Sequence, residues 1–319
     1  MTDLTPAWDE ALIKLGGHLY QSRAWAAFQE VQGRGVLAEA GKGWSWLGAV
    51  RQGRGGIRYL YAAYGPTVQG AALEPAVHSM VAAARDARAD FVRLEPLGDA
   101  TAEGMRQLGA RAVGDMQPKH RLQLDITPDE AELRRAISSS NRNLINTAAA
   151  RGLAFVVSAD PGLIEEHLQM QKETAARGGF KPHAPAYYRA MVDTFLPMGV
   201  GRIYRAEREG HAIASAICLD FGGTRYYVEA ATHPDLNREH KGAIALLWWM
   251  ILDAKAKGLD RFDYGGVAPD DQPGHPWAGH TRFKKSVGGE MITSIGTWEL
   301  PVRPAKYAVY RLAQKLVRS

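Results

Sequence analysis

The chain has 319 residues, of which 46% are hydrophobic and 23% are charged, as in water-soluble globular proteins with a sizeable core. This length favours two domains over one. The formal net charge of +5 and the pI of about 9.2 permit a polyanionic partner without requiring one. The single cysteine, Cys218, excludes an internal disulfide and a metal site built from several cysteines.

Two features of the sequence bear on membranes. Residues 1–17 carry acidic side chains and lack an apolar core of signal-peptide length, and the apolar run 243–252 is too short to span a bilayer. We therefore expect a cytoplasmic protein. The basic amphipathic segment 303–319 leaves two interpretations open. One is a helix packed on its own domain with a solvated basic face, which we favour, and the other is a surface for peripheral membrane contact.

The first half of the chain alternates between helix and strand signals. Trp25 and Phe28 lie three residues apart on one face of a predicted helix, and glycine-rich turns separate the strand segments that follow. The predicted elements are a helix over 21–33, strands over 35–40, 44–50 and 56–66, a helix over 74–88, a strand over 91–96, a helix over 104–110 and a strand over 119–126.

The second half begins with helix signals. Thr127 is expected to cap a helix whose first turn holds Asp129 and Glu130, and Gly152 is expected to end the next helix. The further predicted elements are helices over 140–150, 158–178 and 183–195, a strand pair over 201–221, a strand over 224–232, a helix over 243–256 and a strand over 261–267, with loops over 233–242 and 282–290.

Two or three antiparallel strands, a helix and a further strand follow one another in both halves. This order is the core of the GNAT acyltransferase fold. The predicted fold class is therefore α+β, with two tandem GNAT-like domains, each a mixed, mostly antiparallel sheet flanked by helices. Residues 1–126 are expected to form the first domain, completed by the C-terminal helix 297–319. Residues 127–296 are expected to form the second domain, which carries the main substrate site.

The loop before the helix at 243–256 lacks a feature that this fold normally has. GNAT enzymes hold the pyrophosphate of acetyl-CoA on a glycine-rich turn at the start of that helix, where free N–H groups bind anions. Here the loop reads NREHKGAIA, and Lys241 stands where the first glycine of the pattern belongs. The matching segment of the first half, VQGAALEPAVHS, offers less. The fold signal is thus present while the CoA signal is degenerate.

Short motifs occur in a specific order along nearly the whole chain: QSRAW, YLYAAYGP, NRNLINTAAARGLAF, KETAARGGF, YYVEAAT, FDYGGV and RFKKSVGG. In this order and spacing the chain resembles the FemABX family, and the likeness is to its compact form without a coiled-coil arm. The resemblance implies an aminoacyltransferase of peptidoglycan synthesis and cell-wall biogenesis. It further implies an aminoacyl-tRNA donor and, as acceptor, a UDP-linked or lipid-linked muramyl pentapeptide.

The resemblance also implies site residues. An amine that attacks an aminoacyl ester creates an oxyanion that needs nearby positive charge. The resemblance places a lysine with this role directly after Phe283, at Lys284. Phe283 itself is expected to contact substrate. A pair of lysines in a loop fits a solvated charge run equally well, which is the interpretation kept for Lys285. Arg177 matches a phosphate-binding arginine but also suits the end of a helix. Tyr61 matches a tyrosine whose hydroxyl would hold the acceptor.

Three further residues complete the expected substrate site. Tyr227 falls on the strand that lines the acceptor groove in the resemblance, although a strand tyrosine also fits simple packing. Asp263 and Glu229 are the carboxylates nearest to the expected site, and each is a candidate general base. Neither is singled out by spacing. Basic residues expected to hold the donor tRNA are Arg134, Arg135, Arg142 and those of the C-terminal helix.

Three positions depart from the family pattern. Tyr64 stands in place of an arginine, Gln29 in place of a lysine, and Val287 in place of a phenylalanine. The loss of two cations on the acceptor side leaves the exact acceptor open. The ten histidines show no paired-ligand spacing, and no nucleotide-binding fingerprint occurs, so we expect neither a metal nor a bound cofactor.

Two other functions stay open at this point. One is an acyl-CoA-dependent N-acyltransferase of cell-surface polysaccharide or amino-sugar synthesis, against which the degenerate glycine loop argues. The other is a non-catalytic tandem-GNAT module that binds RNA or a cell-wall precursor. We expect a monomer, because each domain can bury its sheet against the other.

Overall fold

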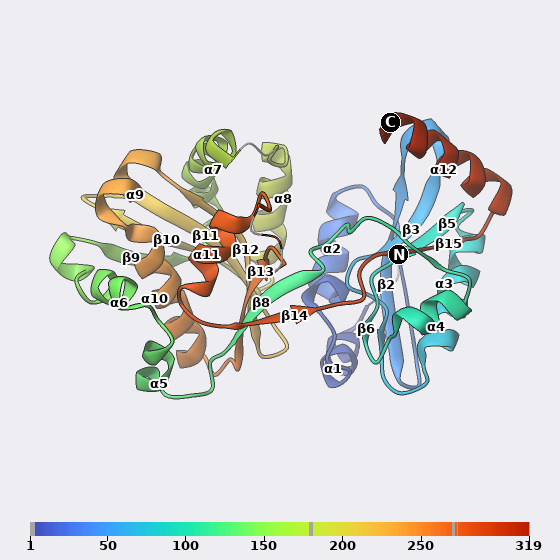
Figure 1. Cartoon of the computed structure of the whole chain (residues 1–319), viewed down its shortest axis with the longest axis horizontal. Coiled ribbons are helices and arrows are strands. Elements are labelled where there is room, and N and C mark those ends of the chain that lie inside the picture. The colour runs from blue at the N-terminus through green and yellow to red at the C-terminus, as the bar shows by residue number, and fades with distance from the viewer. Residues whose placement is uncertain (1–3, 179–180, 270–271, 273, 319) are drawn as a thin grey trace. The chain divides into compact units, whose positions relative to one another are not determined.

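The computed structural model describes residues 4–178, 181–269, 272 and 274–318, except for the side chains of residues 54, 177, 178 and 316–318. The chain forms two compact units (Figure 1). Unit 1 comprises Met1–Lys119 and Thr293–Ser319, and unit 2 comprises His120–Ile292. Each unit contains one mixed sheet with helices around it, so the predicted α+β class is confirmed. In the described part of the chain, no helix is long and apolar enough to cross a membrane.

Unit 1 is built on one sheet. Its strands are β1 (Val36–Gly41), β2 (Trp44–Gln52), β3 (Arg58–Ala62), β4 (Thr67–Val68), β5 (Phe91–Leu94), β6 (Leu97–Gly98), β7 (Arg111–Ala112) and β15 (Trp298–Pro301). Its helices are α1 (Pro6–Lys14), α2 (Arg23–Val31), α3 (Leu73–Asp86), α4 (Ala102–Gln107) and α12 (Pro304–Arg318). The strand order is β6-β4-β2-β3-β5-β15-β7, with β1 paired to β2.

The C-terminal segment belongs to the sheet of unit 1. β15 pairs antiparallel with β5 on one side and with β7 on the other. On α12, Tyr307 is buried and packs against Phe91 of β5, with ring centroids 5.4 Å apart. The opposite face of α12 exposes Val309 and Leu312.

Unit 2 is built on a second sheet. Its strands are β8 (His120–Asp125), β9 (Ala154–Ser158), β10 (Gly201–Arg208), β11 (His211–Phe221), β12 (Thr224–Thr232), β13 (Arg261–Gly266) and β14 (Glu290–Thr293). Its helices are α5 (Glu130–Arg135), α6 (Ser139–Asn146), α7 (Ile164–Gly178), α8 (Pro185–Phe195), α9 (Pro234–His240), α10 (Gly242–Ala256) and α11 (Ala278–Lys285). The strand order is β14-β8-β13-β12-β11-β10-β9.

The predicted domain division at residue 126 differs from the structure by one strand. β8 pairs antiparallel with β13, with Leu124 opposite Phe262, and therefore belongs to unit 2. Leu122 and Leu124 alternate with polar residues and pack into the core of that unit. The helix cap in this region is also corrected, because Asp129, and not Thr127, accepts the N–H of Glu132 at the start of α5.

Helices α7 and α10 lie on opposite faces of the unit 2 sheet (Figure 1). On β11, Ala214 and Ala216 join the apolar cluster that contains the buried face of α10, whereas Ser215 between them bonds His167 of α7. Because successive side chains of a strand point to opposite faces, each face of this sheet is covered by a different helix.

Two segments that were predicted as loops are helices. α9 begins at Pro234, directly after His233, whose side chain caps the N–H of Leu236. α11 begins at Ala278 and ends at Lys285, so it extends into the segment 282–290 that was expected to be a loop. Both helices have eight residues or fewer and are bordered by Pro and Gly, so the turn signals at their ends obscured them in the sequence.

Candidate active site

The sheet of unit 2 is irregular where β12 and β13 end their pairing. Their parallel pairing runs from Thr224–Arg261 to Tyr226–Asp263, and both strands continue beyond it. β12 also bulges here, because Ile217 pairs with Glu229 while Cys218 pairs with Tyr227. Val228 is therefore an extra residue, which reverses the alternation of faces at this point and bends the strand.

Lys284, Asp263 and Arg121 form one charged cluster. Lys284 lies in the last turn of α11 and donates from Nζ to the carbonyl oxygen of Gly266 at 2.7 Å. Asp263 is buried, accepts the N–H of Gly265 at 2.7 Å, and pairs with Arg121 at 2.5 Å between Oδ2 and Nη1. The cluster holds two cations and one carboxylate and thus carries excess positive charge.

The burial of this cluster alters its protonation equilibria. Burial lowers the pKa of Lys284 to about 8, against the opposing effect of Asp263. Burial also raises the pKa of Asp263, which Arg121, the Gly265 N–H and Lys284 oppose. The pKa of His280, one turn before Lys284 on α11, is lowered by burial and by the charge of that lysine. Lys284 is therefore a mostly protonated amine at neutral pH that titrates within the physiological range.

Glu229 faces a polar layer on the α7 side of the sheet. Gln171 of α7 is buried and donates to Glu229 Oε2 at 3.2 Å and to Tyr188 Oη at 3.3 Å. Tyr188 Oη also accepts the N–H of His183 at 3.2 Å. Burial raises the pKa of Glu229 to about 7. A carboxylate that titrates near neutral pH is suited to accept a proton from an attacking amine.

His167 lies within the same layer and is fully buried. Its Nδ1 lies 3.0 Å from Ser215 Oγ, and its Nε2 has no hydrogen-bond partner among the residues described. Burial lowers the pKa of His167 to about 4, so the ring is neutral at pH 7. This histidine is a structural neighbour of the Glu229 network.

Tyr227 and Glu229 do not share a face, although the sequence grouped them. Tyr227 packs against the apolar cluster on the α10 side, with its ring 6.3 Å from that of Phe262. Phe283 packs against the same cluster. Burial raises the pKa of Tyr227 further above its ordinary value. The contacts of Tyr227 and Phe283 thus support the packing interpretation.

Tyr61 lies in unit 1 and its hydroxyl is engaged there. It donates to Glu95 at 3.0 Å, and Gln117 Nε2 lies 3.3 Å from the same hydroxyl. Glu95 is buried and also accepts the backbone N–H of Tyr64 and the hydroxyl of Thr297. Burial is the main cause that raises the pKa of Tyr61.

The remaining predicted residues are basic. The side chain of Arg177 lies outside the described residues. Arg134 already has partners within unit 2. It pairs with Glu130 at 2.8 Å and donates to Asn146, and its guanidinium carbon lies 5.2 Å from the ring centroid of Trp248. Arg135 is exposed and Arg142 is half-buried, so these two arginines keep solvent access.

The N-terminus of α10 is occupied by the chain itself. Lys241 adopts a left-handed conformation with φ 52°, and Asn237 Oδ1 accepts the N–H of Ala243 at 2.9 Å. Gly242 lies against Ile213, since an added Cβ would come within 2.8 Å of that side chain. Arg151 donates to the carbonyl of His240. An anion at this helix end would therefore compete with Asn237.

Sequence reasoning missed several residues of this site. Arg121 alternates with Leu122 and Leu124 on its strand, which marks a polar face but not the partner Asp263. His167 and Gln171 stand four residues apart on the buried side of α7, and this polar pair on a packed helix face was an available signal. Among the residues described, no group of three or more metal-ligating side chains occurs.

Comparisons with known proteins agree with this architecture. The family model of the acetyltransferase (GNAT) domain matches residues 131–285, within unit 2. The aminoacyltransferase FemA of Staphylococcus epidermidis is 30% identical over 79 residues, which are 25% of this chain and 19% of that protein. FemA of Staphylococcus aureus is 32% identical over 79 residues, with the same shares. The chain thus spans about a fifth of the length of these curated relatives.

Solved structures resemble the chain over almost its whole length. The crystal structure of FemX has a TM-score of 0.83 at 15% identity and covers 97% of this chain and 98% of its own. The structure of L-PGS from Bacillus licheniformis has a TM-score of 0.61 at 13% identity, covering 98% and 96%. At these identities the likeness shows the fold, and the predicted tandem GNAT-like architecture is confirmed.

Proposed function

We propose that this tandem GNAT-like protein belongs to the FemABX family, as its likeness to FemA and FemX supports, and that it transfers an amino acid from aminoacyl-tRNA to the stem peptide of a peptidoglycan precursor. The amine of the stem peptide attacks the aminoacyl ester, a C–N bond forms, and the ester C–O bond breaks with release of the tRNA hydroxyl. The acceptor is a muramyl pentapeptide, either UDP-linked or lipid-linked. The proposed compartment is the cytoplasm.

Glu229 and Lys284 take the two chemical roles in this proposal. Glu229, whose pKa is about 7, accepts the proton that the attacking amine loses. Lys284, whose pKa is about 8, is mostly protonated at neutral pH and stabilises the oxyanion of the tetrahedral intermediate. Asp263 and Arg121 act through Lys284 as supporting residues, because the charge of the buried carboxylate, which Arg121 pairs, favours the protonated form of Lys284.

The hydrogen bonding at the N-terminus of α10 is the observation that supports one donor over the other. Asn237 already satisfies the Ala243 N–H, and α9 fills the segment in which a pyrophosphate-binding turn would lie. Acyl-CoA would have to displace this cap before its pyrophosphate gained those N–H groups. An aminoacyl-tRNA ester makes no such demand, so this observation supports tRNA over CoA as the donor.

A two-donor transfer assay tests this proposal. Purified protein receives UDP-linked muramyl pentapeptide with either labelled aminoacyl-tRNA or labelled acetyl-CoA, and a parallel series uses the lipid-linked acceptor. We expect label on the acceptor only from aminoacyl-tRNA, and loss of transfer in Lys284→Met. Transfer only from acetyl-CoA would replace the proposal with the N-acyltransferase alternative. No transfer from either donor to either acceptor would favour the non-catalytic module.

A further inference from the structure

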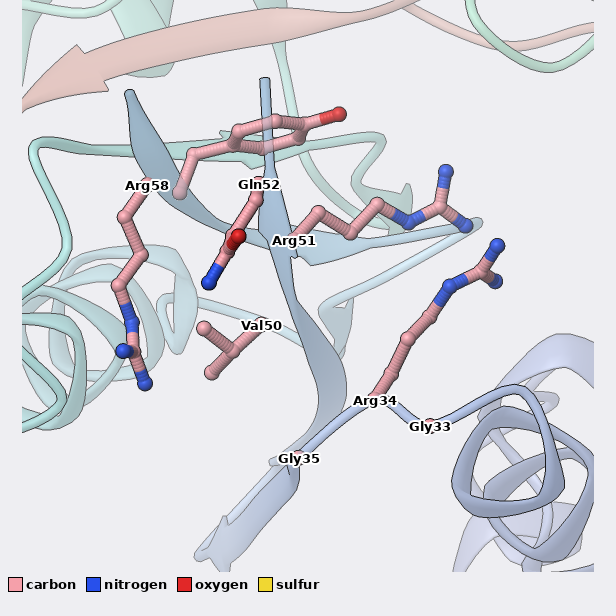
Figure 2. A pocket seen from close by; sticks show the side chains of 8 residues that line it. Gly33, Arg34, Gly35, Val50, Arg51, Gln52 and Arg58 are labelled. Carbon is pink, nitrogen blue, oxygen red and sulfur yellow. The ribbon is translucent and has the colours of Figure 1, made fainter. Parts of the chain in front are cut away.

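A cavity of about 550 Å³ opens in unit 1 where β2 continues past β1 (Figure 2). The N–H of Val50 donates to the carbonyl of Gly35 at 2.8 Å, and Arg51 extends beyond this contact. The cavity is lined mainly by arginine and glycine residues together with Tyr59: Gly33, Arg34, Gly35, Arg51 and Arg58. Its wall is therefore rich in positive charge and in accessible backbone.

Two of the arginines converge. Figure 2 shows the guanidinium groups of Arg34 and Arg51 turned to the same side with their ends near each other, although they come from separate segments. Arg58 points away from this pair. Two like charges held together repel each other, and an anion between them removes that repulsion.

The pair is accompanied by donors that lack acceptors. Arg51 Nε is buried without a hydrogen-bond partner in the described part of unit 1. Gln29 of α2 is buried, and its Oε1 accepts from Arg34 Nη1 at 2.6 Å. The Nε2 of the same amide is buried and has no partner among the described residues. Buried N–H donors are nearly always paired in folded proteins, so these two call for an acceptor.

Arg51 is held in place by an aromatic ring. Its guanidinium carbon lies 4.4 Å from the ring centroid of Tyr61, a cation–π contact. Tyr61 is in turn fixed by its hydrogen bond to the buried Glu95. A guanidinium that is already ordered loses less conformational entropy when it binds a ligand.

We infer that this cavity binds a phosphate or diphosphate group, with the guanidinium groups of Arg51 and Arg34 as the charged donors and with Gln29 holding Arg34 in place through their hydrogen bond. The planar guanidinium fork matches the spacing of phosphate oxygens, and Arg51 presents donors only. The natural ligand rests on the proposed function, under which it is the diphosphate of the nucleotide-linked or lipid-linked acceptor.

Calorimetric titration with inorganic pyrophosphate tests the inference. We expect Arg51→Gln and Arg34→Gln to weaken binding by about 10- to 100-fold each, as the loss of a charge-assisted contact predicts. Arg58→Gln is the matched control, because it removes the same charge from the same cavity wall, and we expect less than about a threefold change. Circular dichroism and thermal unfolding of each variant report whether the fold is retained.

Two further arms separate the ligand sources. The wild-type protein is titrated with UDP and with vesicles that contain a polyprenyl diphosphate, and binding to either one that is lost in Arg51→Gln supports the site. No binding of pyrophosphate, UDP or these vesicles would overturn it, as would an equal loss in Arg58→Gln. Because binding is measured without turnover, the two proposals can fail separately. If the protein binds pyrophosphate through Arg51 but transfers no amino acid, the binding site is supported and the proposed function is refuted.

Discussion

Replacement of Lys284 by methionine removes one charged nitrogen from the candidate site and leaves a good helix former on α11. Under the proposed mechanism this nitrogen faces the oxyanion that develops on the aminoacyl ester. The loss of one such donor costs enzymes about 10²- to 10³-fold in kcat, or about 3–4 kcal/mol. We therefore expect kcat for aminoacyl transfer to fall by that factor.

The same substitution should disturb stability much less. Lys284 Nζ donates one hydrogen bond to the Gly266 carbonyl, and Asp263 keeps Arg121 and the Gly265 N–H when the lysine is absent. One such bond is worth about 1 kcal/mol net, so the unfolding free energy should fall by about 1–2 kcal/mol in urea denaturation. A large kinetic loss beside a small stability loss marks a chemical role.

The pH profile sharpens this test. Because Lys284 must be protonated and its pKa is about 8, wild-type kcat should fall as the pH rises through about 8. The methionine variant should lack this alkaline limb. Lys285→Met, which changes the exposed neighbour on the same helix, is the matched control and should keep both rate and profile. If Lys284→Met keeps kcat within about threefold, or if Lys285→Met loses as much, the role of Lys284 is refuted.

Three further predictions concern unit 2. Glu229→Gln should lower kcat by about 10²- to 10⁴-fold and abolish the acid limb near pH 7, because the base must be deprotonated; an unchanged profile would remove Glu229 as the base. Burial lowers the pKa of His167 from its usual 6.5 to about 4, so between these pH values only the unfolded chain takes up the proton. The unfolding free energy should therefore fall by up to about 3 kcal/mol as the pH drops from 6.5 to 4. His167→Gln should flatten this dependence in urea unfolding, and parallel curves for the two proteins would contradict the assignment. Asn237→Ala should lower the unfolding free energy by about 1 kcal/mol, because the Ala243 N–H loses its hydrogen-bond acceptor. An unchanged urea midpoint would show that this hydrogen bond does not stabilise the fold.

The elements that the sequence predicted well are those with one dominant periodicity. β11 spans His211–Phe221 within the predicted strand pair, and α10 spans Gly242–Ala256, almost as its apolar run indicated. α9 and α11 were hidden because prolines and glycines at their borders outweigh so few helical residues. β8 was assigned to the wrong half because the sequence of a strand does not indicate which other strand it pairs with, and β8 pairs with β13.

The site was predictable only in part for a related reason. Lys284 was predicted as a site residue through the family resemblance alone, since nothing in RFKKSVGG indicates that its Nζ reaches the Gly266 carbonyl. Arg121 and Asp263 are 142 residues apart in the chain, and only the fold brings them together. The split between Glu229 and Tyr227 arises from the extra residue Val228, a bulge that strand alternation alone does not reveal.

A one-pot transfer reaction tests the central claim most directly. The protein is mixed with UDP-linked and lipid-linked muramyl pentapeptide as acceptors, and with aminoacylated tRNAs and acetyl-CoA as donors. The masses of the two acceptors are then measured by mass spectrometry. We predict that one acceptor gains the mass of one amino-acid residue, and that this gain is lost after ribonuclease treatment of the donor and in Lys284→Met. A gain of an acetyl group, or no gain on either acceptor, would contradict the account.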